Sequence, residues 1–169
     1  KLISIKPFPI KKIRPCVFEY IYFSRPDSLL NGKCAYEYRK CFGAELAKEN
    51  SLKADLVVPV PDSGNAAAIG YSQLTNIPFD LGLIRNHYVG RTFIEPAQKI
   101  RSLGVKLKLN ANKTTVKDKI IILIDDSLVR GTTSHKIVKM LYDAGAKEVH
   151  VKIACPEIKY PDFYGVDTP

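Results

Sequence analysis

Residues 121–134 combine side chains that could bind a phosphorylated sugar. An apolar run ends there in the adjacent carboxylates Asp125 and Asp126, a loop containing Gly131 follows, and hydroxyl residues open a predicted helix. The first turn of a helix offers unpaired N–H groups and a positive dipole end, which suit a phosphate. The two carboxylates would repel that phosphate unless they bind sugar hydroxyls or a cation such as Mg²⁺. The segment therefore predicts a site for a sugar phosphate together with magnesium.

A plainer interpretation of the same residues stays open. Asp125 and Asp126 could form a turn at the end of a strand, and Thr132 and Thr133 could be an ordinary helix N-cap. The fourteen-residue pattern as a whole favours the binding site.

Hydrophobic patterning predicts the elements that would position these residues. In chain order they are strand 18–23, a turn at 25–28, helix 35–49, strand 55–60, a helix opening at 66–71, strand 79–84, strand 119–125, helix 132–144 and strand 148–154. In helix 35–49, Tyr38, Phe42 and Leu46 recur at four-residue spacing. The order predicts an α/β fold, with a mostly parallel central sheet flanked by helices. Ligands bind at the carboxyl ends of such strands, so the loops at 61–65, 85–95 and 125–134 are candidates.

Composition indicates one globular domain. The chain has 169 residues, 46% of them hydrophobic and 25% charged, and a net charge of +9 that would attract polyanions without choosing among them. Residues 1–15 are expected to form a basic, proline-containing arm or linker, and residues 16–169 the domain. The four cysteines form no C-x-x-C pair, and no signal peptide or membrane span is visible, which predicts a cytoplasmic protein with reduced thiols.

Residues 121–134 resemble the phosphoribosyl-pyrophosphate (PRPP) binding motif of type I phosphoribosyltransferases. Further stretches resemble the transferase half of the glutamine PRPP amidotransferases, also called amidophosphoribosyltransferases. These stretches are residues 20–28, 60–63, 86–94 and 163–167. The likeness runs from about Cys16 to the end of the chain, so the expected fold is that of a type I phosphoribosyltransferase.

The resemblance implies a role for each matching position. Asp125 and Asp126 would hold the ribose hydroxyls and, with Ser63, the Mg²⁺ ion. Arg91, in a loop at 85–108 that closes over PRPP, would complete the catalytic set by reaching the departing pyrophosphate. The positions expected to contact the substrate are Asp62, Ser63, Gly64, Tyr88, Ser127, Leu128, Val129, Arg130, Gly131, Thr132 and Thr133.

The implied reaction is the first committed step of de novo purine biosynthesis. Ammonia would attack C1 of PRPP, and release of pyrophosphate would give 5-phosphoribosylamine. The family takes this ammonia from glutamine in an N-terminal glutaminase domain, and it continues into C-terminal helices. Neither part is in this sequence, so the chain is expected to be truncated at both ends and to use free ammonia, unless a partner supplies it.

The resemblance does not by itself decide whether this chain holds an iron–sulfur cluster or forms an oligomer. Some members of the family hold an iron–sulfur cluster; Cys16 matches one ligand position, but Asp162 occupies another, so no cluster is expected. A homo-oligomer is left open.

Two other functions remain as alternatives. A base-salvage phosphoribosyltransferase would need a segment that recognises a purine or pyrimidine, and the sequence contains no recognisable one. A non-catalytic PRPP-sensing regulator that binds nucleic acid has weak support from the charge of +9. No helix-turn-helix pattern is visible and the basic residues are scattered, so neither nucleic acid nor a membrane is an expected partner.

Overall fold

A three-stranded parallel sheet forms the centre of the chain, in the order β3 (Leu56–Pro59), β6 (Ile120–Asp125), β7 (Glu148–Ile153). The structure is a computed structural model that describes residues 3–5, 7–9, 11–12, 14–50, 52–88, 108–129 and 131–157. Val57 pairs with Ile122 and Ile122 with His150, so β6 lies between its two neighbours. The predicted α/β fold with a parallel sheet is confirmed.

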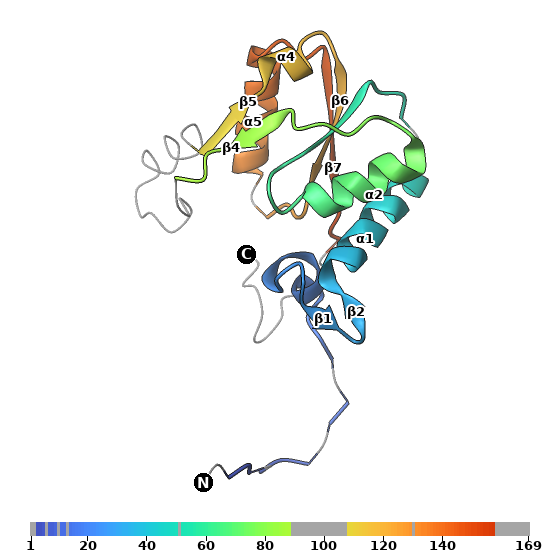
Figure 1. Cartoon of the computed structure of the whole chain (residues 1–169), viewed down its shortest axis with the longest axis vertical. Helices are drawn as coiled ribbons and strands as arrows, with labels where there is room; N and C mark the ends of the chain where they lie inside the picture. Colours follow the sequence, from blue (N-terminus) through green and yellow to red (C-terminus); the bar gives the residue numbers. More distant parts are fainter. Residues whose placement is uncertain are drawn as a thin grey trace.

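Helices cover both faces of this sheet (Figure 1). They are α1 (Ala35–Glu49) and α2 (Asn65–Thr75) on one face and α5 (Thr132–Asp143) on the other, with the short α4 (Lys113–Val116) beside it. Val57, Ile122 and Ile124 pack towards α1 and α2, whereas Val58 and Leu123 pack towards α5. Alternate residues of β3 and β6 thus enter two separate cores, which is why their sequences are continuously apolar.

Helices α1 and α2 approach each other through glycines. A Cβ atom on Gly43 would overlap the carbonyl group of Ala67, and one on Gly70 would overlap the carbonyl of Lys40. The most buried stripe of α1 repeats every four residues and consists of Ala35, Arg39, Gly43 and Ala47. Small residues on this stripe allow the close contact, and Arg39 is its one charged member.

The strand predicted at 18–23 is wrong, because the segment forms a helical turn, η1 (Glu19–Phe23). The Ser24 N–H donates to the carbonyl of Glu19 at 3.2 Å, five residues back. Phe18 and Ile21, three residues apart, are both buried. The aromatic and β-branched composition favours a strand, but burial of one side at helical spacing decides the conformation.

The strand predicted at 79–84 is also shorter than expected. Phe79 makes a single parallel bridge to Val57, and β4 (Leu83–Arg85) then pairs antiparallel with β5 (Leu109–Ala111). A second hairpin pairs β1 (Leu29–Leu30) with β2 (Lys33–Cys34). The predicted elements at 35–49, 55–60, 119–125, 132–144 and 148–154 are confirmed to within one or two residues.

The described residues of the N-terminal arm are exposed and form no helix or strand. Figure 1 shows this part of the chain leading away from the body of the molecule. The boundary at residue 15 stays a prediction. In the part of the chain that the structure describes, no helix has the length and apolar character needed to span a bilayer.

Candidate functional site

The adjacent carboxylates lie at the carboxyl end of the middle strand. Asp125 is the last residue of β6, and the side chains of both acids are buried, with 9% of Asp125 and 7% of Asp126 exposed. Backbone N–H groups just after β7 bind both main-chain carbonyls: Ala154 donates to Asp125 at 3.0 Å and Cys155 to Asp126 at 2.8 Å. These contacts fix the backbone of the pair at the sheet edge where parallel sheets bind ligands.

The loop between β3 and α2 brings Ser63 to this acid pair. The Ser63 hydroxyl donates to Asp126 Oδ1 at 3.1 Å, although the two residues are 63 positions apart. The contact depends on Gly64, where a Cβ atom would overlap the carbonyl oxygen of Ile124 and lie 2.9 Å from that of Val60. Since β3 and β6 are neighbours, their carboxyl-end loops meet, and two predicted site segments become one site.

The acid pair is electrostatically asymmetric. Burial raises the pKa of Asp125 to about 8, and the side-chain hydrogen bond with Asp126 and its negative charge act in the same direction. The Asp126 N–H, which donates to Asp125 Oδ1 at 2.9 Å, acts against them. The other carboxylate is supplied with donors, since the hydroxyls of Ser63 and Ser127 both bind Asp126, each at 3.1 Å. A protonated Asp125 could donate to a sugar oxygen, whereas a cation or hydroxyl donors would favour its ionised form.

The start of α5 leaves its N–H groups without a side-chain cap. The N-cap residue is Gly131, which has a φ of +67° and no side chain, so the ordinary N-cap by Thr132 or Thr133 is not formed. A positive φ of this size favours glycine. Leu128 and Val129 are 54% and 53% exposed. Among the described residues, no side chain caps the main-chain donors of this first turn.

Several predicted site residues lie apart from this cluster or outside the described residues. Asp62 is exposed and forms an ion pair with Arg85 at the end of β4. Tyr88 is fully exposed, and its N–H donates to the side chain of Asn86. Positions outside the described residues are Arg91, Arg130, Asp162, the resemblance stretch 163–167 and most of the predicted lid.

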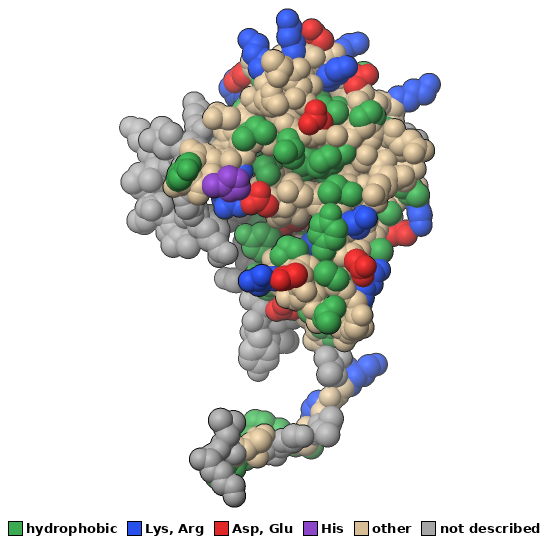
Figure 2. Space-filling model, viewed as in Figure 1, with side chains coloured by type: hydrophobic (Ala, Val, Ile, Leu, Met, Phe, Trp, Pro, Cys, Tyr) green, Lys and Arg blue, Asp and Glu red, His purple; other side chains and the backbone are tan. Residues whose placement is uncertain are grey.

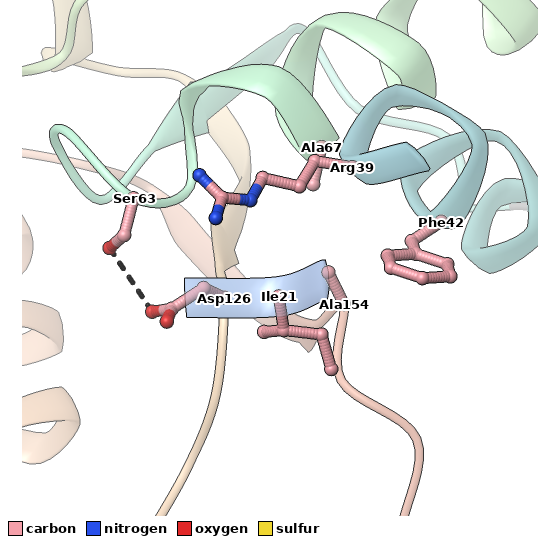
Figure 3. A pocket seen from close by; sticks show the side chains of 7 residues that line it. All are labelled: Ile21, Arg39, Phe42, Ser63, Ala67, Asp126 and Ala154. Atoms are coloured by element: carbon pink, nitrogen blue, oxygen red, sulfur yellow. Dashed lines mark hydrogen bonds between the residues drawn. The ribbon is translucent and has the colours of Figure 1, made fainter. Parts of the chain in front are cut away.

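Arg39 is a residue near the site that sequence patterning missed. It lines a small cavity behind Asp126, together with Ser63 and Ile21 (Figure 3). The remaining lining residues are Phe42, Ala67 and Ala154. The sequence pattern that could have indicated its burial is Arg39 at four-residue spacing among small residues of the same helix face, Ala35, Gly43 and Ala47.

The donor set fits magnesium. Asp125, Asp126 and Ser63 offer only oxygen atoms, which Mg²⁺ prefers, and Mg²⁺ is commonly held by one or two carboxylates plus substrate oxygens. Among the described residues no group of three or more His, Cys, Asp or Glu side chains could hold a metal ion. Oxygens of a bound substrate would therefore have to complete the coordination shell.

Basic side chains do not form a continuous surface on the face drawn in Figure 2. Most Lys and Arg side chains lie around its outline among acidic ones, and a few lie nearer the middle beside the hydrophobic side chains gathered there. On this face the basic side chains are thus dispersed, in contrast to the basic stripe typical of nucleic-acid binding.

Comparison with known proteins shows extensive similarity to amidophosphoribosyltransferases. The enzyme of Rhizobium etli is 58% identical over 97% of this chain, and that of Bacillus subtilis is 56% identical over 90%. A chloroplastic amidophosphoribosyltransferase of Glycine max is 56% identical over 92%. The resemblance predicted from the motifs is confirmed. No protein-family model matches the chain.

The similarity extends to solved structures. The B. subtilis glutamine PRPP amidotransferase, solved in complex with ADP and GMP, superposes with a TM-score of 0.80 at 56% identity and 90% coverage of this chain. A structure described as the allosteric regulatory enzyme of purine biosynthesis gives a TM-score of 0.79. The chain spans 33% of the R. etli enzyme and 34% of the B. subtilis structure, about a third of the length of these relatives.

Proposed function

We propose that this chain is the PRPP-binding transferase part of an amidophosphoribosyltransferase, and that it joins ammonia to C1 of PRPP with release of pyrophosphate. The observation that carries the proposal is the meeting of Ser63 with the buried pair Asp125 and Asp126, next to an uncapped helix start. Sequence identity of 53–58% to enzymes of that name supports the same reaction class.

The described residues would bind the two ends of the substrate differently. Asp126 and Asp125 would accept hydrogen bonds from the ribose hydroxyls, and the N–H groups that begin α5 would bind the 5-phosphate. Ser63 and the backbone of residues 62–64 would face the pyrophosphate. Mg²⁺, when bound, would neutralise charge on the pyrophosphate oxygens. These contacts would hold the ribose still while its bond to the leaving group lengthens.

The chain's task in the transition state would be to stabilise separated charge. Positive charge develops on the ribose ring and negative charge on the departing pyrophosphate. Hydrogen-bond donors already held in place stabilise that negative charge. Arg91 is proposed to reach the pyrophosphate from the loop at 85–108. Neutral ammonia carries its own lone pair, so attack at C1 requires no strongly basic side chain.

Calorimetry of PRPP with and without Mg²⁺, followed by assay of ammonia-dependent pyrophosphate release, tests the proposal. The chain should bind PRPP with Mg²⁺, and the double substitution Asp125→Asn, Asp126→Asn should abolish binding and turnover. The matched control is Asp118→Asn with Asp143→Asn, two exposed positions outside the site. The control pair should behave like the unchanged chain.

Two results would contradict the proposal. One is unaltered PRPP binding by the Asp125→Asn, Asp126→Asn variant. The other is exchange of label between PRPP and a free purine or pyrimidine base, which would indicate a salvage enzyme instead.

A further inference from the structure

Arg39 is a buried cation directly behind the candidate site. It is 7% exposed, and among the described residues the other buried side chains of the acidic and basic amino acids are Asp125 and Asp126. Figure 3 shows its guanidinium group extending from α1 towards Ser63, on the side of the cavity where Asp126 also lies. A buried guanidinium is costly unless its charge and its donors are offset.

The hydrogen bonds of Arg39 go to uncharged groups. Nε donates to the carbonyl of Tyr20 at 2.9 Å, and Nη2 donates to the carbonyl of Ser24 at 2.7 Å. Both acceptors belong to η1 or the residue after it, so the planar fork of the guanidinium ties this turn to α1. These bonds satisfy donors but leave the positive charge without an adjacent anion.

Asp126 provides the opposite charge across the cavity. The negative charge of Asp126 acts on Arg39 against the effect of burial, which lowers the pKa of the guanidinium. Arg39 forms no ion pair with a described carboxylate, so the two groups interact through the cavity without contact. In a buried region such an interaction is screened less than at the surface.

We propose that Arg39 is a positioning residue for PRPP binding, which holds η1 against α1 and keeps a permanent positive charge behind Asp126. The proposal rests on the proposed function, because the charge matters to the substrate only if the acid pair binds PRPP. Arg39 would not touch PRPP; it would reduce the repulsion between the acid pair and a substrate that carries several negative charges.

The experiment separates the charge of Arg39 from its hydrogen bonds. Arg39→Gln removes the charge but keeps an amide donor, whereas Arg39→Lys keeps the charge but cannot hold both carbonyls in one plane. Arg25→Met is the control, because Arg25 follows η1 on the surface and its ion pair among the described residues is with the exposed Asp27. The measurements are circular dichroism, the calorimetric Kd for PRPP with Mg²⁺, and KM and kcat determined separately.

We expect affinity for PRPP to fall when the positive charge at position 39 is removed and to be kept when the charge is kept. Arg39→Gln should raise Kd and KM for PRPP about tenfold with a smaller change in kcat, and Arg39→Lys should stay within about threefold of the unchanged chain. Arg25→Met should change neither. A structural role alone would lower the folded fraction and kcat in both variants while KM stayed constant.

The outcomes distinguish this inference from the proposed function. If the unchanged chain does not bind PRPP, the proposed function fails and the role of Arg39 with it. If it binds PRPP and folded Arg39→Gln binds equally well, only the role of Arg39 is wrong. If Arg39→Gln does not fold, Arg39→Lys decides: a folded lysine variant with more than about tenfold weaker binding overturns the inference.

Discussion

At the scale of single residues, the candidate site contains a buried carboxyl group whose ionisation is unfavourable. Asp125 is buried beside a second carboxylate, which raises its pKa to about 8. An unfolded aspartate has a pKa near 3.9. Between these values the folded chain retains a proton that the unfolded chain releases, so this residue makes stability fall as pH rises from about 4 to 8.

Asp125→Asn should therefore stabilise the fold at pH 8 while it abolishes PRPP binding. The gain should be on the order of 2 kcal/mol at pH 8 and less than about 0.5 kcal/mol near pH 4, where the native residue is protonated in the folded chain and about half protonated in the unfolded chain. Urea unfolding at both pH values, in buffer with a metal chelator, measures it. The control Asp118→Asn, at an exposed position, should change stability by the same amount at both pH values. If Asp125→Asn instead destabilised the fold, and did so more at pH 8 than at pH 4, the raised pKa of Asp125 would be disproved.

Two glycines near the candidate site are required for different physical reasons. Gly64 lies against the carbonyls of Ile124 and Val60, whereas Gly131 has a φ of +67° with open space around it. Gly64→Ala should cost about 2 kcal/mol because backbone atoms must move. Gly131→Ala should cost about 1 kcal/mol from its backbone conformation alone. Urea unfolding measures the loss of stability in each variant. If Gly131→Ala lost as much stability as Gly64→Ala, or more, the close packing described at Gly64 would be contradicted.

At the scale of elements, the contact of α1 with α2 places both Arg39 and the start of α2 near the acid pair. The two helices approach closely because Gly43 and Gly70 lack side chains. If they separated, Arg39 would move away from the cavity, and the loop that carries Ser63 would shift with α2.

Gly43→Ala tests this helix contact. Alanine is the better helix former by about 1 kcal/mol, yet its methyl group would overlap the carbonyl of Ala67. The net result should be destabilisation by about 2 kcal/mol, measured by urea unfolding. Glu45→Ala, at an exposed position of the same helix, should change stability by less than about 0.5 kcal/mol. A stabilised Gly43→Ala variant would show that the helices can separate without cost.

At the scale of the whole molecule, the candidate site combines segments from distant parts of the chain: the ends of β3 and β6, the start of α5, and η1. A ligand that bridges such segments binds the folded chain and not the unfolded one. Binding there must raise the stability of the entire fold.

PRPP with Mg²⁺ should accordingly raise the thermal unfolding midpoint. At a ligand concentration of 100 times Kd the stabilisation is about 2.7 kcal/mol. For a chain of this length that corresponds to roughly 5–10 °C. A thermal-shift assay measures it, with the Asp125→Asn, Asp126→Asn variant as the unresponsive comparison. An equal shift in that variant would place PRPP elsewhere on the molecule.

The sequence by itself determined the three strands of the central sheet, the helices α1, α2 and α5, and the motif at residues 121–134, because apolar periodicity and turn residues are local properties. It also placed Asp125 and Asp126 correctly at the end of β6. It did not determine η1, whose composition suits a strand as well as a helix, nor the burial of Arg39.

Only the tertiary structure decided which of the predicted residues meet. Ser63 reaches Asp126 because β3 and β6 are neighbours in the sheet, and Arg39 lies behind the pair because two glycines let α1 approach α2. The physical reason is that local patterns fix hydrogen bonding and burial within a segment. Contacts between side chains far apart in the sequence depend instead on how whole elements pack.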